Sequence, residues 1–443
     1  MLQRINGHPI RACIRMAEAE FPAPFAHTLE YSPAARGTWN IVHTGMLLPE
    51  THQIYICAAG CLRGVVLTAA EMGAMERFST IEVKEAELTD ADNENFLITG
   101  ISDIIDRLPQ QPRAVLVFPA CVHHFLGVNF AYVYASLCQK YPHIDFIPCM
   151  MDPIRQTRSL TPEQRERRAI YQQLRPAAER DAKACNILSS NLPTDPDSEL
   201  MQLLTANGWK VRDMTTCTTY DEFLQMARAQ FNLWYNPFGG PAAQDCATRL
   251  GQDSLHIPQL WRYEEISAVL QSVAARIGVP QPDWQQQITA CEQALATLYR
   301  DIGKVPIVLD FTFAFNPASL ARLLLEHGFN VCALYADAFL PEDEPNFRWL
   351  QQHYPDLWLW STKNADMRLQ PRTTDGKKVL ALGQKAAYFT GTPYFVNLVE
   401  GGGLFAFTGI VKLAHLMQEA FHAAKDTEAL IRRKGWGGPC CLC

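Results

Sequence analysis

The segment IYICAAGCLRG (residues 54–64) joins a short apolar run to a glycine-containing turn with two cysteines. A second segment of the same kind, VLVFPAC (residues 115–121), ends in Cys121. Short runs rich in β-branched and aromatic residues predict buried strands, so Cys57, Cys61 and Cys121 are expected at the carboxyl ends of strands. In an open α/β sheet that edge is where ligands bind. Grouped thiolates at such an edge favour iron–sulfur or zinc chemistry over hard cations.

Outward from these segments, apolar runs alternate with helix-like stretches along the whole chain. Strands are expected at residues 52–57, 114–118, 144–149, 184–189, 209–214, 231–235, 304–310, 330–335, 357–360, 379–382 and 394–398. Helices are expected at residues 95–108, 130–140, 153–176, 199–207, 221–230, 317–327 and 410–424. Strands that alternate with helices predict βαβ units and mainly parallel sheets, that is, an α/β fold.

The length of 443 residues exceeds what one hydrophobic core ordinarily holds. We expect three Rossmann-like domains: residues 1–152 with the cysteines, residues 153–303, and residues 304–443 with a cysteine-rich tail. Within the second, residues 155–180 are rich in arginine and glutamate. Mixed charges of this kind predict a solvent-exposed helix face.

The composition restricts the class of protein. Hydrophobic residues make up 48% and charged residues 19%, which is typical of a globular chain rather than a disordered one. A net charge of −7 argues against a general nucleic-acid binder. Neither a long apolar run nor a secretory signal is present, so we expect a cytoplasmic protein without a membrane partner. The 14 cysteines then suggest reduced thiols and metal ligands before disulfides.

The local features of the cysteines leave two interpretations open. Cys57 and Cys61 form C-x-x-x-C, which is looser than the C-x-x-C of redox or zinc sites. Gly60 and Gly64 would let the backbone approach a cluster and offer N–H groups to it. Alternatively the three cysteines are buried structural thiols, because free cysteine is among the most buried residue types. His123 and His124 follow Cys121, where a histidine is more often a capping or surface residue than a ligand.

The order and context of these residues resemble component 1 of nitrogenase and its relatives, including the dark-operative protochlorophyllide reductase subunits. In that family a His-Gly-Pro-x-Gly-Cys turn supplies one cluster ligand, and residues 57–61 occupy the matching place. Residues 118–127 resemble the segment of the next ligand. Residues 200–214 and 220–233 are similar to parts of the family's second domain, so the likeness extends along nearly the whole chain.

The resemblance implies an iron–sulfur cluster held by Cys57, Cys61 and Cys121, either [4Fe-4S] or a larger P-cluster-like cluster. It also implies three partners: an ATP-hydrolysing iron protein as electron donor, a homologous or identical second subunit, and a small-molecule substrate. Family members place the cluster at the interface of two subunits, so a fourth ligand would come from a partner, from water or from a side chain other than cysteine. The isolated monomer is then expected to expose an apolar patch around the cluster loops.

Two departures from the family pattern restrict the function. The family's earliest cluster cysteine would fall near Leu29, where no cysteine stands, and Cys57 replaces the family's histidine as a substitute ligand. The nearest matches to the two cofactor ligands of nitrogenase are Asn236 and Asn397, and neither is a credible iron ligand. We therefore expect neither the nitrogenase cofactor nor dinitrogen reduction. Asn236, Asn397 and Glu400 are candidates to line a pocket between the domains.

Two further segments have more than one interpretation. The glycine-rich loop 400–403 would either cradle an anion or form a tight turn, and it lacks the lysine and serine or threonine of a P-loop. The tail carries Cys440, Cys441 and Cys443. These thiols are either incidental in a poorly ordered end, metal-binding, or part of a C-a-a-X prenylation signal.

Three functions are consistent with the sequence. The leading hypothesis is a nitrogenase-like reductase component with an unidentified substrate. The second is a scaffold that assembles or carries a metallocofactor without turnover. The third is a cluster-free Rossmann-like binding protein or transferase, in which the thiols are buried or bind zinc.

Overall fold

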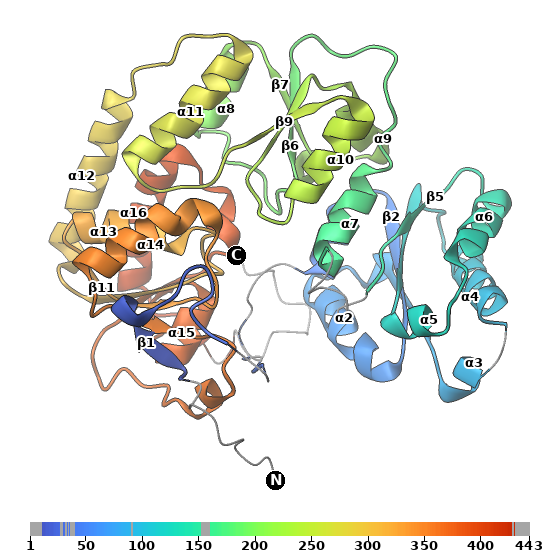
Figure 1. The fold of residues 1–443 in the computed structure, drawn as a ribbon, viewed down its shortest axis with the longest axis horizontal. Helices are drawn as coiled ribbons and strands as arrows, with labels where there is room; N and C mark the ends of the chain where they lie inside the picture. Colours follow the sequence, from blue (N-terminus) through green and yellow to red (C-terminus); the bar gives the residue numbers. More distant parts are fainter. Residues whose placement is uncertain are drawn as a thin grey trace.

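The computed structural model describes residues 11–26, 30–31, 33, 35, 40–89, 92–151, 160–427 and 429. These residues form three sheets with helices packed on their faces, and all but one of the strand pairings are parallel (Figure 1). The predicted α/β class with mainly parallel sheets is confirmed. In the part of the chain so described, no helix is long and apolar enough to cross a membrane.

The first sheet has the order β3-β2-β4-β5, with every pairing parallel. Its strands are β2 (Thr51–Cys57), β3 (Phe78–Glu82), β4 (Ala114–Pro119) and β5 (Asp145–Pro148). Its helices are α1 (Ile41–Met46), α2 (Ala59–Glu71), α3 (Glu85–Thr89), α4 (Asn93–Arg107), α5 (Cys121–Phe125) and α6 (Phe130–Lys140). Every residue of β2 and β4 is buried, as expected for central strands covered on both faces.

The second sheet has the order β7-β6-β8-β9 and is also entirely parallel. Its strands are β6 (Ala184–Leu188), β7 (Lys210–Asp213), β8 (Phe231–Trp234) and β9 (Asp253–His256). The helices of this part of the chain are α7 (Pro162–Tyr171), α8 (Glu199–Ala206), α9 (Tyr220–Leu224), α10 (Gly240–Leu250), α11 (Tyr263–Ile277) and α12 (Gln285–Ile302). Helix α7 begins at a capping box between Thr161 and Gln164, with Pro162 at its first turn.

The third sheet has the order β1-β12-β11-β10-β13-β14. Its strands are β1 (Cys13–Arg15), β10 (Pro306–Asp310), β11 (Asn330–Tyr335), β12 (Trp358–Trp360), β13 (Leu380–Leu382) and β14 (Phe395–Val396). The helices α13 (Pro317–Glu326), α14 (Glu344–His353), α15 (Gln384–Thr390) and α16 (Ala406–His422) follow its strands. Strand β1 pairs antiparallel with β12, although it lies in the expected first domain. The domain boundaries at 152 and 303 stay a prediction.

The units share their cores. One apolar cluster joins residues of the first and second sheets, and a larger one joins the second and third. Figure 1 shows α7 at the junction between the first unit and the second. The predicted solvent-exposed helix is shorter than expected and is wrong at two positions, because Glu166 and Arg167 of α7 are buried. Neighbouring units cover that face, which the charge pattern of one helix does not reveal.

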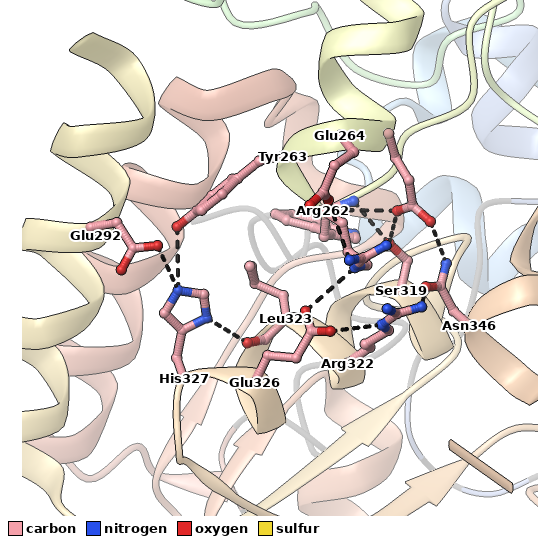
Figure 2. A network of polar contacts seen from close by, with 12 residues as sticks. Arg262, Tyr263, Glu264, Glu292, Ser319, Arg322, Leu323, Glu326, His327 and Asn346 are labelled. Carbon is pink, nitrogen blue, oxygen red and sulfur yellow. Dashed lines mark hydrogen bonds and ion pairs between the residues drawn. The ribbon is translucent and has the colours of Figure 1, made fainter. Parts of the chain in front are cut away.

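A polar network joins the second unit to the third (Figure 2). Arg262, which precedes α11, forms an ion pair of 3.3 Å with Glu326 of α13. His327 Nε2 lies 3.0 Å from Glu292 Oε1 on α12 and 3.4 Å from the Tyr263 hydroxyl. The second and third units are therefore held together by polar contacts as well as by a shared apolar core.

Candidate functional site

The three candidate cysteines lie at the topological switch point of the first sheet. The chain passes from β2 to β3 on one side and then to β4 on the other, which makes the carboxyl ends of β2 and β4 the switch point at which ligands bind in open α/β sheets. Cys57 is the last residue of β2, Cys61 lies in the first turn of α2, and Cys121 opens α5 after β4. The topology therefore brings the three cysteines to one edge.

The three thiols differ in their surroundings. Cys57 is buried, Cys121 is partly buried and Cys61 is exposed. The pKa of Cys57 is raised to about 12, mainly by burial and to a smaller extent by the neighbouring Cys61 and Cys121 sulfurs. Cys61 and Cys121 are thus each within electrostatic reach of Cys57. Cys57 stays a thiol at neutral pH unless a bound metal takes the place of its proton.

The donor set fits a cluster better than a single ion. Among the described residues, no three His, Cys, Asp or Glu side chains come together closely enough to hold one metal ion. Cysteines that bind different irons of one cluster need not converge on a point, whereas a tetrahedral zinc site requires it. A Cβ added at Gly60 or Gly64 would meet nothing within 4 Å, so the face of α2 beside Cys61 is open. In donor type the three thiols suit iron–sulfur ligation, and the cluster stays a prediction.

His123 takes part in its own turn. It is buried, and its Nδ1 lies 3.2 Å from the Ala120 carbonyl oxygen. Burial lowers the pKa of this imidazole, which keeps it neutral at pH 7. This geometry favours the capping interpretation of His123 over a ligand role.

Large apolar side chains are exposed on the segments that carry the cysteines. Phe125 of α5 is 70% exposed and Leu67 of α2 is 39% exposed. Figure 1 shows α2 and α5 at the same end of the first unit. The other exposed large apolar residues of the described chain are Met75, Leu126 and Tyr132 in this unit, and Trp358 and Leu369 in the third. The first unit thus holds most of the apolar surface that a partner would cover.

The second sheet has its own switch point, between β6 and β8. The residues Ser189, Ser190 and Asn191 follow β6 and are all buried. Asn236 follows β8, is 1% exposed, and its Oδ1 accepts a hydrogen bond of 2.9 Å from the Phe238 amide. Asn236 therefore closes a turn at this edge.

Arg167 and Glu400 complete a buried polar network at the second-sheet edge. Arg167 has no exposed surface, and it donates to the Ser189 carbonyl oxygen at 2.7 Å and to Glu163 Oε1 at 2.7 Å. It also donates to Asn191 Oδ1, and Asn191 Nδ2 donates to Glu400. The network joins α7, the second-sheet edge and the loop after β14.

The structure brings only two of the three predicted pocket residues to this edge. Asn397 lies instead at the carboxyl end of the third sheet, where its Oδ1 accepts a hydrogen bond of 2.6 Å from Gln384. The pocket role of Asn236, Asn397 and Glu400 stays a prediction. Cys440, Cys441, Cys443 and Leu29 lie outside the described residues.

The glycine-rich loop 400–403 has the geometry of a tight turn. Its four residues all have positive φ, and the amides of Glu400 and Gly401 donate to Thr312 and Phe313 carbonyls. A Cβ on Gly403 would lie 2.3 Å from the Pro193 carbonyl oxygen. The loop packs against the second unit, and its Glu400 and Gly401 amides already donate to backbone carbonyls. This favours the tight turn over an anion-binding loop.

The role of Arg167, Glu163 and Asn191 in this network was not predicted from the sequence. The signal for Asn191 was present, because polar residues follow the apolar strand 184–188 as the cysteines follow theirs. Glu163 and Arg167 stand four residues apart on α7, a spacing that predicts an ion pair but not its burial.

The chain is similar to known proteins in both sequence and fold. The family model for nitrogenase component 1 type oxidoreductase matches residues 47–414. The fold is similar to "Nitrogenase Cp1 at pH 6.5", with a TM-score of 0.67 and 9% identity over 90% of this chain and 94% of that one. It is also similar to "Nitrogenase Cp1 at pH 5", with a TM-score of 0.60 and 13% identity over 93% and 94%. No curated protein matches the sequence.

Proposed function

Because the chain belongs to the nitrogenase component 1 type oxidoreductase family, we propose that it is an iron–sulfur reductase component that accepts electrons from an ATP-dependent iron protein. One observation carries the proposal. Cys57, Cys61 and Cys121 come from separate elements and lie at the same carboxyl edge of the first sheet, at its switch point. Ligands bind at this place in open α/β sheets.

Cys57, Cys61 and Cys121 would hold the cluster, either [4Fe-4S] or a larger P-cluster-like one. When bound, the cluster supplies one-electron storage at a potential set by its surroundings. The buried Cys57 would anchor it on the protein side, and the exposed Cys61 would face the partner. The iron protein and a second subunit, identical or homologous, would meet the open side of this edge. A cytoplasmic location stays a prediction.

The second-sheet edge is the proposed place of the small-molecule substrate. Asn236 and Glu400 border it, and the buried Arg167 supplies a fixed positive charge. These groups would orient a polar substrate by hydrogen bonds, while the surrounding burial excludes water. The described side chains at this edge now bond to one another, so substrate entry requires the third-unit loop or α7 to shift.

A scaffold for a metallocofactor is the second candidate function. It is favoured by Asn236 and Asn397, because amides at the positions of the family's cofactor ligands would release a cargo instead of retaining it. Electron flux separates the two functions. A scaffold transfers its cluster to an acceptor protein and passes no electrons from an iron protein to a small molecule.

The test is the iron, zinc and acid-labile sulfide content of anaerobically purified protein, with EPR of the dithionite-reduced state. We expect iron and sulfide at about four or more per chain in the wild type and their loss in Cys121→Ser. Cys138→Ser is the matched control, because Cys138 is an exposed cysteine on α6 of the same unit. Zinc, absence of metal, or an unchanged Cys121→Ser protein would refute the cluster.

A further inference from the structure

Glu166 is a buried acid that the proposed function does not yet use. It lies on α7, is 1% exposed, and neither carboxyl oxygen has a hydrogen-bond partner among the described residues. Most buried polar atoms in proteins are hydrogen-bonded, so such an unpaired carboxyl calls for a physical reason.

The surroundings of Glu166 offer it no donor. A Cβ placed on Gly45 would lie 3.0 Å from Glu166 Oε1 and 2.7 Å from Gln53 Nε2, so both side chains press on this glycine. Gln53 uses its amide elsewhere, donating to the Val42 carbonyl oxygen at 3.0 Å and accepting from the Tyr55 hydroxyl at 2.9 Å. A charged carboxylate here would be desolvated without compensation, which is costly.

Burial therefore favours the protonated, neutral form of Glu166. Burial raises the pKa of this carboxyl well above its usual range, and the lowering by Arg167 does not offset it. Arg167 is already hydrogen-bonded to Glu163, whose own charge raises the pKa of Glu166 further. The titratable or charged groups on the elements packed around Glu166 include Glu163, Arg167 and Tyr171 on α7, His43 on α1, His52, Tyr55 and Cys57 on β2, Asp145 on β5 and Cys149 after it, and Cys246 and the Asp245–Arg249 pair on α10.

Glu166 lies between the two sheet edges. On one side is Tyr55, which is within electrostatic reach of both Glu166 and Cys57 and stands two residues before Cys57 on β2. On the other side, the next residue of α7, Arg167, contacts Asn191 of the second-sheet edge. Tyr55 shares one face of β2 with Cys57 and with Gln53, which approaches Gly45 together with Glu166. In such a low-dielectric interior electrostatic interactions are strong.

We propose that Glu166 is a redox-linked proton site: at pH values at which its carboxyl is ionised before reduction, it binds one proton when one electron is added at the thiol edge. This inference rests on the proposed function. The electron comes from the one-electron donor, the iron protein, and the proton comes from water. An O–H bond forms on the Glu166 carboxylate, and the added negative charge at the thiol edge is offset inside the protein. Glu166 acts through the cluster site and is a positioning residue, since it touches no ligand.

The first test is infrared spectroscopy of the metal-free full-length chain in D2O. We expect a carbonyl stretch from a protonated carboxylic acid in the wild type that disappears in Glu166→Gln. Glu199→Gln is the matched control, because Glu199 is a buried carboxyl that accepts hydrogen bonds from Thr408 at the start of α16. Its spectrum should keep the band. A wild type without the band, or one unchanged in Glu166→Gln, would overturn the inference.

The second test is the reduction potential of the iron-loaded protein as a function of pH. Above the pKa that Glu166 has before reduction, the wild-type potential should fall by up to about 59 mV per pH unit, a tenfold change in the electron equilibrium per unit. Glu166→Gln should lose this slope, Glu166→Asp should keep it over a displaced pH range, and Glu199→Gln should behave as wild type. An equal slope in Glu166→Gln would reduce Glu166 to a structural role.

The two proposals fail in different ways. Absence of iron from the wild type refutes the proposed function, and the redox coupling with it, while the infrared band still reports whether Glu166 holds a proton. Normal iron content with a potential whose slope ignores Glu166 refutes only the inference.

Discussion

The carboxyl edges of the first and second sheets have the same topology, but the first is exposed and the second is covered by other parts of the chain. At the first edge the thiols of Cys57, Cys61 and Cys121 border an open helix face and exposed apolar side chains. At the second edge the fully buried Arg167 is hydrogen-bonded on several sides, and Glu400 arrives from the third unit. A switch point thus creates a place for a ligand, and the elements packed above it decide whether a partner has to complete it.

The difference follows from what covers each edge. Helix α7 and the loop 400–403 lie over the second edge and satisfy its polar groups. No described element makes the same contacts over the first edge. Substitutions at the first edge are therefore expected to change the binding of partners and metal. Substitutions at the second edge are expected to change the stability of the fold.

The largest expected effect comes from disrupting the hydrogen-bonded second-sheet edge. Arg167→Met leaves Glu163 and the Asn191 carbonyl oxygen buried without their donor, so we expect a loss of about 3–5 kcal/mol in the free energy of unfolding. Urea denaturation of the metal-free chain measures it. Arg168→Met is the control, since Arg168 is exposed on the same helix, and it should change stability by less than about 0.5 kcal/mol. Equal effects of the two substitutions would mean that the network does not hold this edge.

The next prediction concerns the exposed carboxyl edge of the first sheet. Phe125→Asp places a charge in the apolar surface and should weaken association with the second subunit by at least about 2 kcal/mol, roughly 30-fold in Kd. Sedimentation velocity over a concentration series measures the change. Leu369→Asp is the control, because Leu369 is 69% exposed, compared with 70% for Phe125, but lies in the third unit. If both variants associate like the wild type, the partner does not bind through α5.

A matched pair of glycines sharpens the contrast in packing. Gly45→Ala drives a methyl group against Gln53 and Glu166 and should cost about 1–3 kcal/mol. Gly64→Ala adds the same methyl group to the open face of α2, where it should stabilise by about 0.5–1 kcal/mol. Thermal unfolding of both variants against wild type is the measurement. A destabilised Gly64→Ala protein would show that the first edge is already covered in the free chain.

The smallest prediction is a difference in pH dependence. Burial raises the pKa of Asp213, at the end of β7, to about 6. The unfolded chain releases this proton near pH 4, so the folded state binds more protons between about pH 4 and 6 and loses stability as pH rises. The slope is about 1.4 kcal/mol per pH unit at its steepest.

Asp213→Asn should remove this contribution to the pH dependence of unfolding, measured by urea denaturation at a series of pH values. Cys57 at the first edge does not titrate in this range, because the pKa of its thiol is near 12 when folded. Asp103→Asn changes a half-exposed carboxyl on α4 and should leave the slope as it is. If the free energy of unfolding of Asp213→Asn still falls with pH in this range, another buried acid causes the pH dependence.

Local pattern predicted the central elements of each sheet. The strands expected at 114–118 and 330–335 match β4 and β11, because fully buried parallel strands are continuous apolar runs. Strands β3 and β9 were missed, since FSTIE alternates buried and exposed residues and DSLH has no apolar run. Strand β1 is only three residues long, and its partner lies far along the chain, so nothing local marks it.

In the candidate site, too, some features were predictable from local sequence and others were not. The placement of the cysteines followed from the end of a strand, which is a local feature. The burial of Arg167 depends on contacts with Thr44 of the first unit and with Ser189 and Asn191 after β6, all distant from α7 in the sequence. Charge spacing on one helix carries no information about which face another unit covers.

The pairing of β1 with β12 has a consequence for synthesis of the chain. Arg15 donates to the Asp356 carbonyl oxygen across a separation of 341 residues. Both other sheets are therefore an insertion between one strand of the third sheet and the remainder of it. On the ribosome, β1 cannot pair until β12 has been made, while the two enclosed units can fold as they appear. Synthesis of the residues between β1 and β12 therefore delays completion of the third sheet.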